Sequence, residues 1–370
     1  MKKQISSMDL HFLVREMQDL KDSRIDKIYN PEKETIIFSL HKSNVGKSLL
    51  RIDVGKAVYV FEDKEGYPEI LGFGQFLRKH LDGHFLTGIE QVQPERIIKF
   101  TFKAKESLKY LYIELFGKGN AILCDEHNVI INVLERHDFR ERSVKPRLKY
   151  AYPIMAYNVF DLNEGNLIDM LRNSKKDTLV ISLATELGLG GLYSEEVCLL
   201  CGIDKNTIPK NIDEHQIQSI TSSIKKLSGK KTDAKVVLEN SNVADFIPFD
   251  FEFYKNREKK AFDSFSRAIS YFYSQFKEVQ ETPNEKKIKE LQRITEQQKQ
   301  AIGELKKEEH EMRQKGEAIY QNYQLIKEVL EEINKASKKY SWKEIKEKLK
   351  GHKVVKEVNE KERKVIVDVD

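Results

Sequence analysis

Four short β-rich runs follow one another in the middle of the chain: RIIKFTFK (96–103), YLYIELF (110–116), AILC (121–124) and VIINVL (129–134). Each is rich in aromatic and branched residues, and a short polar or glycine-containing connection separates it from the next. Earlier runs of the same kind occupy 24–29, 35–41, 49–54, 57–61 and 85–92. Consecutive short strands with short connections predict a mostly antiparallel sheet.

Two amphipathic helices accompany these strands. Ser6-Ser-Met-Asp9 has capping-box spacing, and apolar residues follow it on one helical face. A second helix is predicted over 69–81, with Gly83 as its stop signal. The fold class is therefore α+β, with a mostly antiparallel sheet domain that we place at 1–160.

The rest of the chain divides into four parts. Residues 161–233 look helical, and the Gly188-Leu-Gly-Gly191 turn predicts either a helix-hairpin-helix module or a plain αα-hairpin. Residues 234–282 contain a strand and an aromatic helix, which we expect to return to the sheet domain. Apolar residues recur every seven positions within 283–340 and predict a long coiled-coil helix. A small module occupies 341–370.

The coiled-coil stripe has no second helix of similar length in this sequence. It could therefore form a coiled-coil dimer or pair with a missing segment. The small module combines a capped helix at 341–349 with a β-hairpin from 354–358 and 364–369, and the sequence stops on that last strand. We therefore expect a truncated chain or a naturally short form.

Bulk composition limits the classes of protein that fit. The chain has 370 residues, a net charge of +5 and a pI near 8.7, so a polyanionic partner is allowed but not required. No run approaches the roughly 18 apolar residues of a membrane span. The N-terminus lacks the apolar core of a signal peptide. These features predict a cytoplasmic protein with no membrane partner.

Signatures of catalysis and metal binding are missing. The three cysteines, Cys124, Cys198 and Cys201, argue against a disulfide scaffold, and the last two have CxxC spacing without a second ligand pair. We expect buried structural cysteines and no metal. There is no P-loop, nucleophile elbow, zinc-protease or dinucleotide motif, and the glycines of 117–119 predict a tight connection between strands. The prediction is a non-enzyme without a cofactor.

Basic residues give the stronger signal. Lysine and arginine neutralise phosphates, and arginine planes can stack on unpaired RNA bases. The candidates are Arg78 and Lys79 on the second helix, Arg96 at the start of a strand, and Arg136, Arg140 and Arg142 in a basic loop. For each, the alternative is a solvated or salt-bridged surface residue. Backbone N–H groups at Gly188, Gly190 and Gly191 could also contact phosphate.

Ordered blocks of the sequence resemble one family. They are the segments 5–17, 24–30, 76–83, 94–98 and 114–123, and in this order they resemble the NFACT proteins (the Rqc2, NEMF and RqcH group, similar to fibronectin-binding protein A), of archaeal type. The resemblance implies a formamidopyrimidine-glycosylase-like sheet domain, a helix-hairpin-helix module and a coiled coil. The resemblance does not extend to the C-terminal NFACT-R domain of that family, so we expect a chain that lacks this domain.

The resemblance also implies a function and sharpens three positions. NFACT proteins hold a tRNA on a large ribosomal subunit whose nascent chain is stuck, and the tRNA is typically an alanine acceptor. An Asp near the start of their first helix matches Asp9, and an Asp-Arg pair matches Glu95-Arg96. Asp9 has the alternative of being the acidic member of a capping box. Glu95 keeps the charge of the family's Asp and extends its reach by one methylene.

Three functions stay open at this stage. The leading hypothesis is a ribosome-associated quality control factor that recruits tRNA for mRNA-independent C-terminal tailing, with the chemistry done by the ribosome. One alternative is a glycosylase-like DNA-repair protein, although the N-terminal proline nucleophile and the zinc finger of those enzymes are absent from Met1-Lys-Lys-Gln4 and the sequence that follows. Another alternative is a fibronectin-binding adhesin, which would require an extracellular location.

Overall fold

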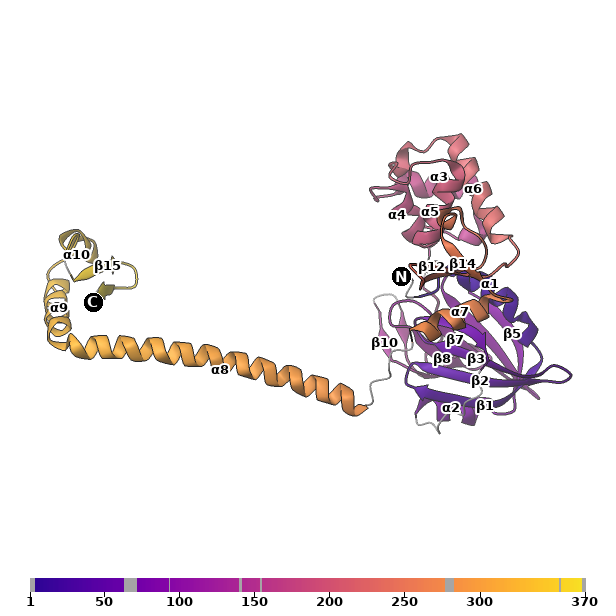
Figure 1. Cartoon of the computed structure of the whole chain (residues 1–370), viewed down its shortest axis with the longest axis horizontal. Helices are drawn as coiled ribbons and strands as arrows, with labels where there is room; N and C mark the ends of the chain where they lie inside the picture. Colours follow the sequence, from indigo (N-terminus) through magenta and orange to yellow (C-terminus); the bar gives the residue numbers. More distant parts are fainter. Residues whose placement is uncertain are drawn as a thin grey trace. The chain divides into compact units, whose positions relative to one another are not determined.

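The chain folds into two units, Met1–Lys277 and Glu278–Asp370 (Figure 1). The computed structural model describes residues 4–62, 72–92, 94–139, 142–153, 155–276, 283–352 and 354–367. The first unit contains a large sheet and a group of short helices. The second contains a long helix and a small terminal module.

A large antiparallel sheet dominates the first unit. Within the described residues it has nine strands in the order β4-β3-β2-β1-β5-β6-β7-β8-β9. Their bounds are β1 Ser23–Glu32, β2 Thr35–Lys42, β3 Gly46–Asp53, β4 Ala57–Phe61, β5 Phe85–Gln91, β6 Ile97–Ala104, β7 Ser107–Glu114, β8 Asn120–Cys124 and β9 Ile130–Val133. Strands that follow one another in sequence are mostly neighbours, so short turns account for the topology. The predicted α+β fold with an antiparallel sheet is confirmed.

Two helices belong to this sheet. Helix α1 (Ser7–Glu16) has the predicted capping box at its start, continues as the 3₁₀ turn η1 (Met17–Leu20), and buries its apolar face. Helix α2 (Phe73–Leu81) is shorter than predicted, and residues 69–71 of the prediction lie outside the described residues. The basic segment expected as a loop forms a short hairpin, β10 (His137–Asp138) and β11 (Ser143–Val144).

Two glycines bring distant loops together. A Cβ atom placed on Gly119, whose φ is +74°, would lie 2.2 Å from the amide nitrogen of Gly55. No side chain fits there, so the turn before β4 and the loop before β8 touch through their backbones. The same two loops hold the N-terminal residues: Ile5 donates its N–H to the Lys56 carbonyl (3.0 Å), and Gln4 Nε2 donates to the Gly117 carbonyl (3.3 Å).

A helical region and a small sheet complete the first unit. The helices are α3 (Glu164–Asn173), α4 (Leu179–Thr185), α5 (Gly191–Cys201) and α6 (Glu214–Ser228), with 3₁₀ turns η2 (Val159–Asp161) and η3 (Pro209–Asn211). They gather on one side of the large sheet (Figure 1). A three-stranded sheet follows, from β12 (Lys235–Glu239), β13 (Asn242–Ile247) and β14 (Glu258–Ala261), with turn η4 (Glu252–Tyr254) before β14. Helix α7 (Phe265–Gln275) then packs against α1 and β4.

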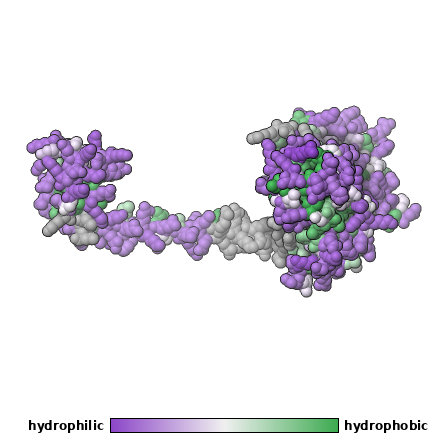
Figure 2. Space-filling view, turned by 90° about the horizontal axis from the view of Figure 1, so that it is seen from above, coloured by the Kyte–Doolittle hydropathy of each residue, from purple (hydrophilic) through white to green (hydrophobic). Residues whose placement is uncertain are grey.

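The second unit begins with α8 (Pro283–Gln321), and α9 (Tyr323–Ser337) follows it. The predicted long helix is interrupted at Asn322, whose backbone is not α-helical (φ −104°, ψ 22°). The side-chain Nδ2 of Asn322 donates to the Ala318 carbonyl (3.1 Å). The apolar stripe of α8 is solvent-exposed on an otherwise hydrophilic surface (Figure 2). The terminal module consists of α10 (Trp342–Lys348), β15 (Val355–Asn359) and β16 (Lys364–Val367), which share a small core with α9. Dimerisation through the stripe stays a prediction.

Candidate nucleic-acid interface

A cleft of about 660 Å³ opens between the start of the chain and the helical region. One wall comes from the N-terminal segment and from the loop between β5 and β6, and the other comes from the glycine turn between α4 and α5. The lining includes Glu95, Arg96, Gly188, Gly190 and Gly191. Five of the residues predicted to bind tRNA or phosphate, distant in sequence, therefore face one cavity.

Hydrogen bonds fix the first wall. Arg96 donates to Gln4 Oε1 (3.1 Å) and to the Ile5 carbonyl (3.4 Å). Ser7 Oγ donates to the Pro94 carbonyl (2.5 Å), and Gln91 Nε2 donates to the Ser7 carbonyl (3.0 Å). The start of the chain and the loop before β6 are thus tied to each other, and the Arg96 side chain is held at the edge of the cleft.

Asp9 lies behind this wall and is fully buried. Its Oδ2 accepts hydrogen bonds from the backbone N–H and the hydroxyl of Ser6 (both 2.7 Å), as the capping-box alternative expected. Its Oδ1 accepts a hydrogen bond from the hydroxyl of Tyr193 in α5 (3.0 Å). In this arrangement Asp9 joins α1 to the helical region, and its carboxylate is not exposed to a ligand.

The second wall is the glycine turn. Gly188 and Gly190 have φ values of +74° and +82°, which side-chain-bearing residues rarely adopt. The Gly190 N–H donates to the Ala184 carbonyl (3.2 Å), so this glycine shapes the turn instead of offering its N–H to phosphate. Helix α5 begins at Gly191 without a side-chain cap, and its first N–H groups lack acceptors within the helix.

Opposite charges sit side by side at the cleft. Burial raises the pKa of the Glu95 carboxyl above its ordinary value, and the neighbouring backbone and guanidinium of Arg96 oppose this rise. Burial also lowers the pKa of Arg96, while the negative charges of Glu95 and Asp9 oppose that fall. A carboxylate acceptor beside a planar donor is a pairing that can read the edge of a base and hold a phosphate.

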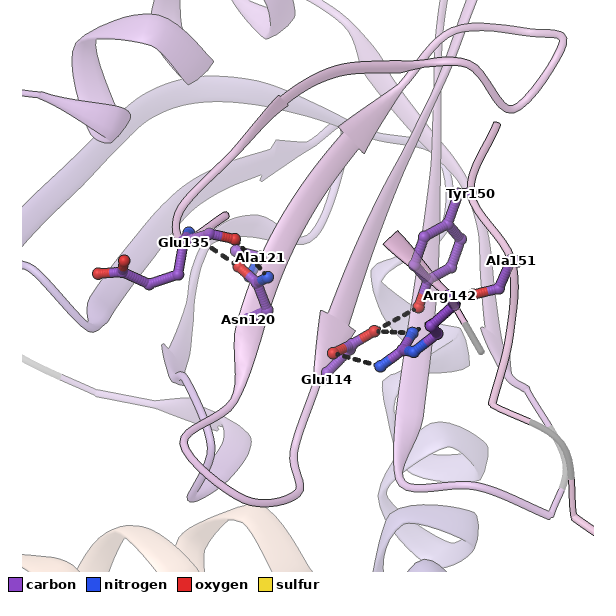
Figure 3. A network of polar contacts seen from close by, with 7 residues as sticks. All are labelled: Glu114, Asn120, Ala121, Glu135, Arg142, Tyr150 and Ala151. Atoms are coloured by element: carbon purple, nitrogen blue, oxygen red, sulfur yellow. Dashed lines mark hydrogen bonds and ion pairs between the residues drawn. The ribbon is translucent and has the colours of Figure 1, made fainter. Parts of the chain in front are cut away.

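Arg142 has a structural position that the sequence did not reveal. It donates to both oxygens of Glu114, at 2.6 and 3.2 Å, and Tyr150 Oη donates to the same carboxylate at 2.9 Å (Figure 3). Only 9% of the Arg142 side chain and 4% of the Glu114 side chain are exposed. Burial lowers the pKa of Arg142, but the bonds and charge of Glu114 outweigh it and raise that pKa. The predicted RNA contact is instead a buried ion pair.

The other predicted cations do not converge on the cleft. Arg136 is exposed just before β10, and Arg140 lies outside the described residues. Arg78 and Lys79 belong to α2, at the end of the large sheet away from the helical region (Figure 1). Arg78 Nε donates to the Ile28 carbonyl (2.6 Å), while Lys79 is exposed. A ligand in the cleft would therefore be held without α2.

Comparison with known proteins identifies the family. A family model described as "NFACT N-terminal and middle domains" matches residues 6–364. The chain belongs to the NFACT family. Its similarity to relatives extends over the whole sequence: it is 28% identical to the archaeal Rqc2 homolog aRqcH of Methanocaldococcus jannaschii over 99% of this chain. It is 25% identical to the human ribosome quality control complex subunit NEMF over 93% of this chain.

These relatives are longer than this NFACT chain, which spans 58% of the archaeal protein and 35% of human NEMF. Among solved structures, a fibrinogen-binding protein of Staphylococcus aureus superposes with a TM-score of 0.61 at 18% identity. That alignment covers 72% of this chain and 98% of the other. The N-terminal part of a fibronectin/fibrinogen-binding protein from Streptococcus suis gives 0.58 at 21% identity, over 73% and 99%. Both likenesses concern the fold.

Other features of this NFACT chain carry little chemistry. Burial raises the pKa of the Cys198 thiol to about 11, so it is a poor nucleophile. In the described part of the chain, no group of three His, Cys, Asp or Glu residues could hold a metal ion. No helix there is long and apolar enough to cross a membrane.

Sequence reasoning missed Tyr193 and Asp245, which also line the cleft. Tyr193 is almost completely buried in α5, and Asp245 lies in β13. A tyrosine or aspartate in an apolar segment gives no local sign of a partner far away in the chain. The nearest signal in the sequence was the Gly188–Gly191 turn, which marks the start of α5, the helix that carries Tyr193.

Proposed function

We propose that this NFACT chain acts in ribosome-associated quality control and holds a tRNA against the cleft between the N-terminal segment and α5. The convergence of Glu95, Arg96 and the start of α5 on one cavity supports this proposal most directly. Arg96 supplies a planar donor, Glu95 an acceptor and α5 the positive end of a helix dipole. Asp9 contributes by holding α1 against α5.

The wider role follows from the relatives, which are named as ribosome quality control proteins. In this proposal the chain is a non-enzymatic cytoplasmic factor that binds the stalled large ribosomal subunit. It selects and places the tRNA, an alanine acceptor, for mRNA-independent tailing. The ribosome's own peptidyl-transferase centre makes the peptide bonds. Helix α8 would extend along the subunit.

A tRNA-binding titration at about 50 mM salt tests the proposal, because phosphate contacts are strongest at low salt. We expect the wild-type chain to bind tRNA and Arg96→Ala to bind roughly 10- to 100-fold more weakly, as for the loss of a bidentate base or phosphate contact. Lys79→Ala should bind like wild type, because Lys79 lies on α2. No binding by the wild type, or an equal loss in both variants, would contradict the cleft assignment.

Arg96 also holds Gln4 and Ile5, so a second control separates the two roles. Gln4→Ala removes the hydrogen bond to Arg96 from the other side, together with the bond to the Gly117 carbonyl, and leaves the guanidinium in place. We expect Gln4→Ala to keep most of the tRNA affinity, within about threefold, because the lost hydrogen bonds are internal to the chain and the guanidinium that would contact RNA is kept. Affinity that falls as far in Gln4→Ala as in Arg96→Ala would assign Arg96 a purely structural role.

A further inference from the structure

Two exposed aromatic rings stand on the surface beyond the buried Arg142–Glu114 pair. Phe139 is 49% exposed next to β10, and Tyr152 is 43% exposed after β11. Single exposed aromatic residues are common on protein surfaces. These two differ because the chain segments that carry them are both held by the buried Arg142–Glu114 pair and its neighbours.

Arg142 connects the two positions. Its guanidinium carbon lies 4.9 Å from the centroid of the Phe139 ring, and its Nη1 donates to the Ala151 carbonyl (3.3 Å), next to Tyr152. The Tyr152 hydroxyl donates to the hydroxyl of Tyr112 in β7 (3.2 Å). Both rings are therefore held in place with part of their surface open to solvent, which lowers the entropy lost when a flat ligand stacks on them.

Two exposed cations stand on the segment that leads to Tyr152. Arg147 and Lys149 are both exposed, and no ion pair within the described residues involves either of them. Lys145, earlier on the same segment, is neutralised by Asp138 (2.5 Å). Aromatic rings among unneutralised cations match unpaired nucleotides, whose bases stack and whose phosphates are anionic.

The rings are also continuous with the cleft. Met155 lines the cleft only three residues after Tyr152. On the other side, Arg142 lies close enough to Glu95 for its positive charge to favour the carboxylate. The rings and the cleft are therefore linked through the charge of Arg142 and through a separation of only three residues along the chain.

We propose that Phe139 and Tyr152 form a stacking platform for unpaired RNA bases, with Arg147 and Lys149 contacting the adjoining phosphates. This proposal rests on the RNA-binding function and extends it to residues outside the cleft. The platform favours single-stranded or loop nucleotides over duplex, because bases inside a duplex have no free face to stack. Purines, which have the larger ring system, should bind it better than uracil.

Fluorescence anisotropy with labelled A12, U12 and a 12-base-pair RNA duplex tests the platform on the whole chain. We expect A12 to bind more tightly than U12, and Phe139→Ala or Tyr152→Ala to weaken A12 binding roughly 5- to 150-fold, as for the loss of one base–aromatic stack. The preference for A12 over U12 should disappear with the ring. Phe139→Trp and Tyr152→Phe keep a flat ring and should retain binding.

Phe85→Ala is the matched control. Phe85 is 47% exposed, but it pairs with Lys103 near the far end of β6, roughly 20 Å from Arg96 along the strand. If Phe139→Ala and Tyr152→Ala bind A12 as tightly as Phe85→Ala does, the platform is refuted. A wild-type chain that binds neither tRNA nor A12 refutes the RNA-binding function itself, whereas tRNA binding that depends on Arg96 and not on the rings refutes the platform alone.

Discussion

Replacing Arg142 by alanine should destabilise the first unit strongly, because it leaves the Glu114 carboxylate buried without its cation. The change removes two charge-assisted hydrogen bonds, at 2.6 and 3.2 Å, from a pair whose side chains are 9% and 4% exposed. Tyr150 then remains as the donor to Glu114 among those shown in Figure 3. Removal of one partner from a buried ion pair lowers the free energy of unfolding by about 3–5 kcal/mol.

Urea denaturation, monitored by near-ultraviolet circular dichroism, measures this loss of free energy of unfolding. In a thermal scan, a loss of about 3–5 kcal/mol should lower the melting temperature by about 6–20 °C, at about 2–4 °C per kcal/mol. The control is Arg257→Ala: Arg257 pairs with Glu239 at the same 2.6 Å, but both side chains are about half exposed. An exposed pair contributes at most about 1 kcal/mol.

A double substitution separates the two causes of the loss. Glu114→Gln with Arg142→Met removes both charges together, so at least half of the lost stability should return, since an uncharged buried pair carries no desolvated charge. The salt dependence of RNA binding should not change in the double variant, because Arg142 does not face phosphate. A loss below about 1 kcal/mol in Arg142→Ala, equal to that of Arg257→Ala, would refute the buried-pair reasoning.

Three further changes test other parts of the fold. Tyr193→Phe removes the hydroxyl that donates to buried Asp9 and should lower the free energy of unfolding by about 1–3 kcal/mol in urea titrations; an unchanged midpoint would contradict this. Gly119→Ala would place a Cβ atom 2.2 Å from the backbone nitrogen of Gly55, and should lower the free energy of unfolding by at least about 2 kcal/mol. The control Gly72→Ala, where φ is also positive but the space is open, should lower it by about 1 kcal/mol. Burial lowers the pKa of His11 below 6.5, so the unfolded chain binds more protons and stability falls as pH drops through about 6.5; His11→Gln should flatten that slope in melting curves between pH 7.5 and 5, and an unchanged slope would refute the assignment.

Local chemistry predicted the parts of the fold that depend on neighbours in sequence. Alternating apolar runs indicated the strands of the large sheet, and Ser6 with Asp9 indicated the start of α1. The interruption at Asn322 was not predicted, because a seven-residue apolar repeat continues through it. In that region the heptad pattern records which residues are apolar, whereas Val329 and Ile333 of α9 pack into the small core of the terminal module.

The candidate site was only partly predictable, because its residues act through partners far away in the chain. Arg96, which the family resemblance singled out for tRNA recognition, lines the cleft, and its contact with tRNA stays a prediction. Arg142 belongs to the same basic segment as Arg136, yet its partner Glu114 stands 28 residues earlier on β7. Asp9 and Tyr193 are separated by 184 residues. A sequence pattern identifies charged residues, but three-dimensional neighbours decide which of them are exposed to a ligand.

The cap of α7 has a consequence for the order in which the chain can fold during synthesis. Glu16, at the end of α1, accepts hydrogen bonds from the backbone N–H groups of Phe265 (2.7 Å) and Ser266 (3.2 Å), about 250 residues later. Until a ribosome has released residue 275, α1 lacks this partner and part of the cover for its apolar face. Long-range closure of this kind is slow and exposes apolar surface. The packing of α1 is thus completed only after α7 has been made, although α1 itself is made first.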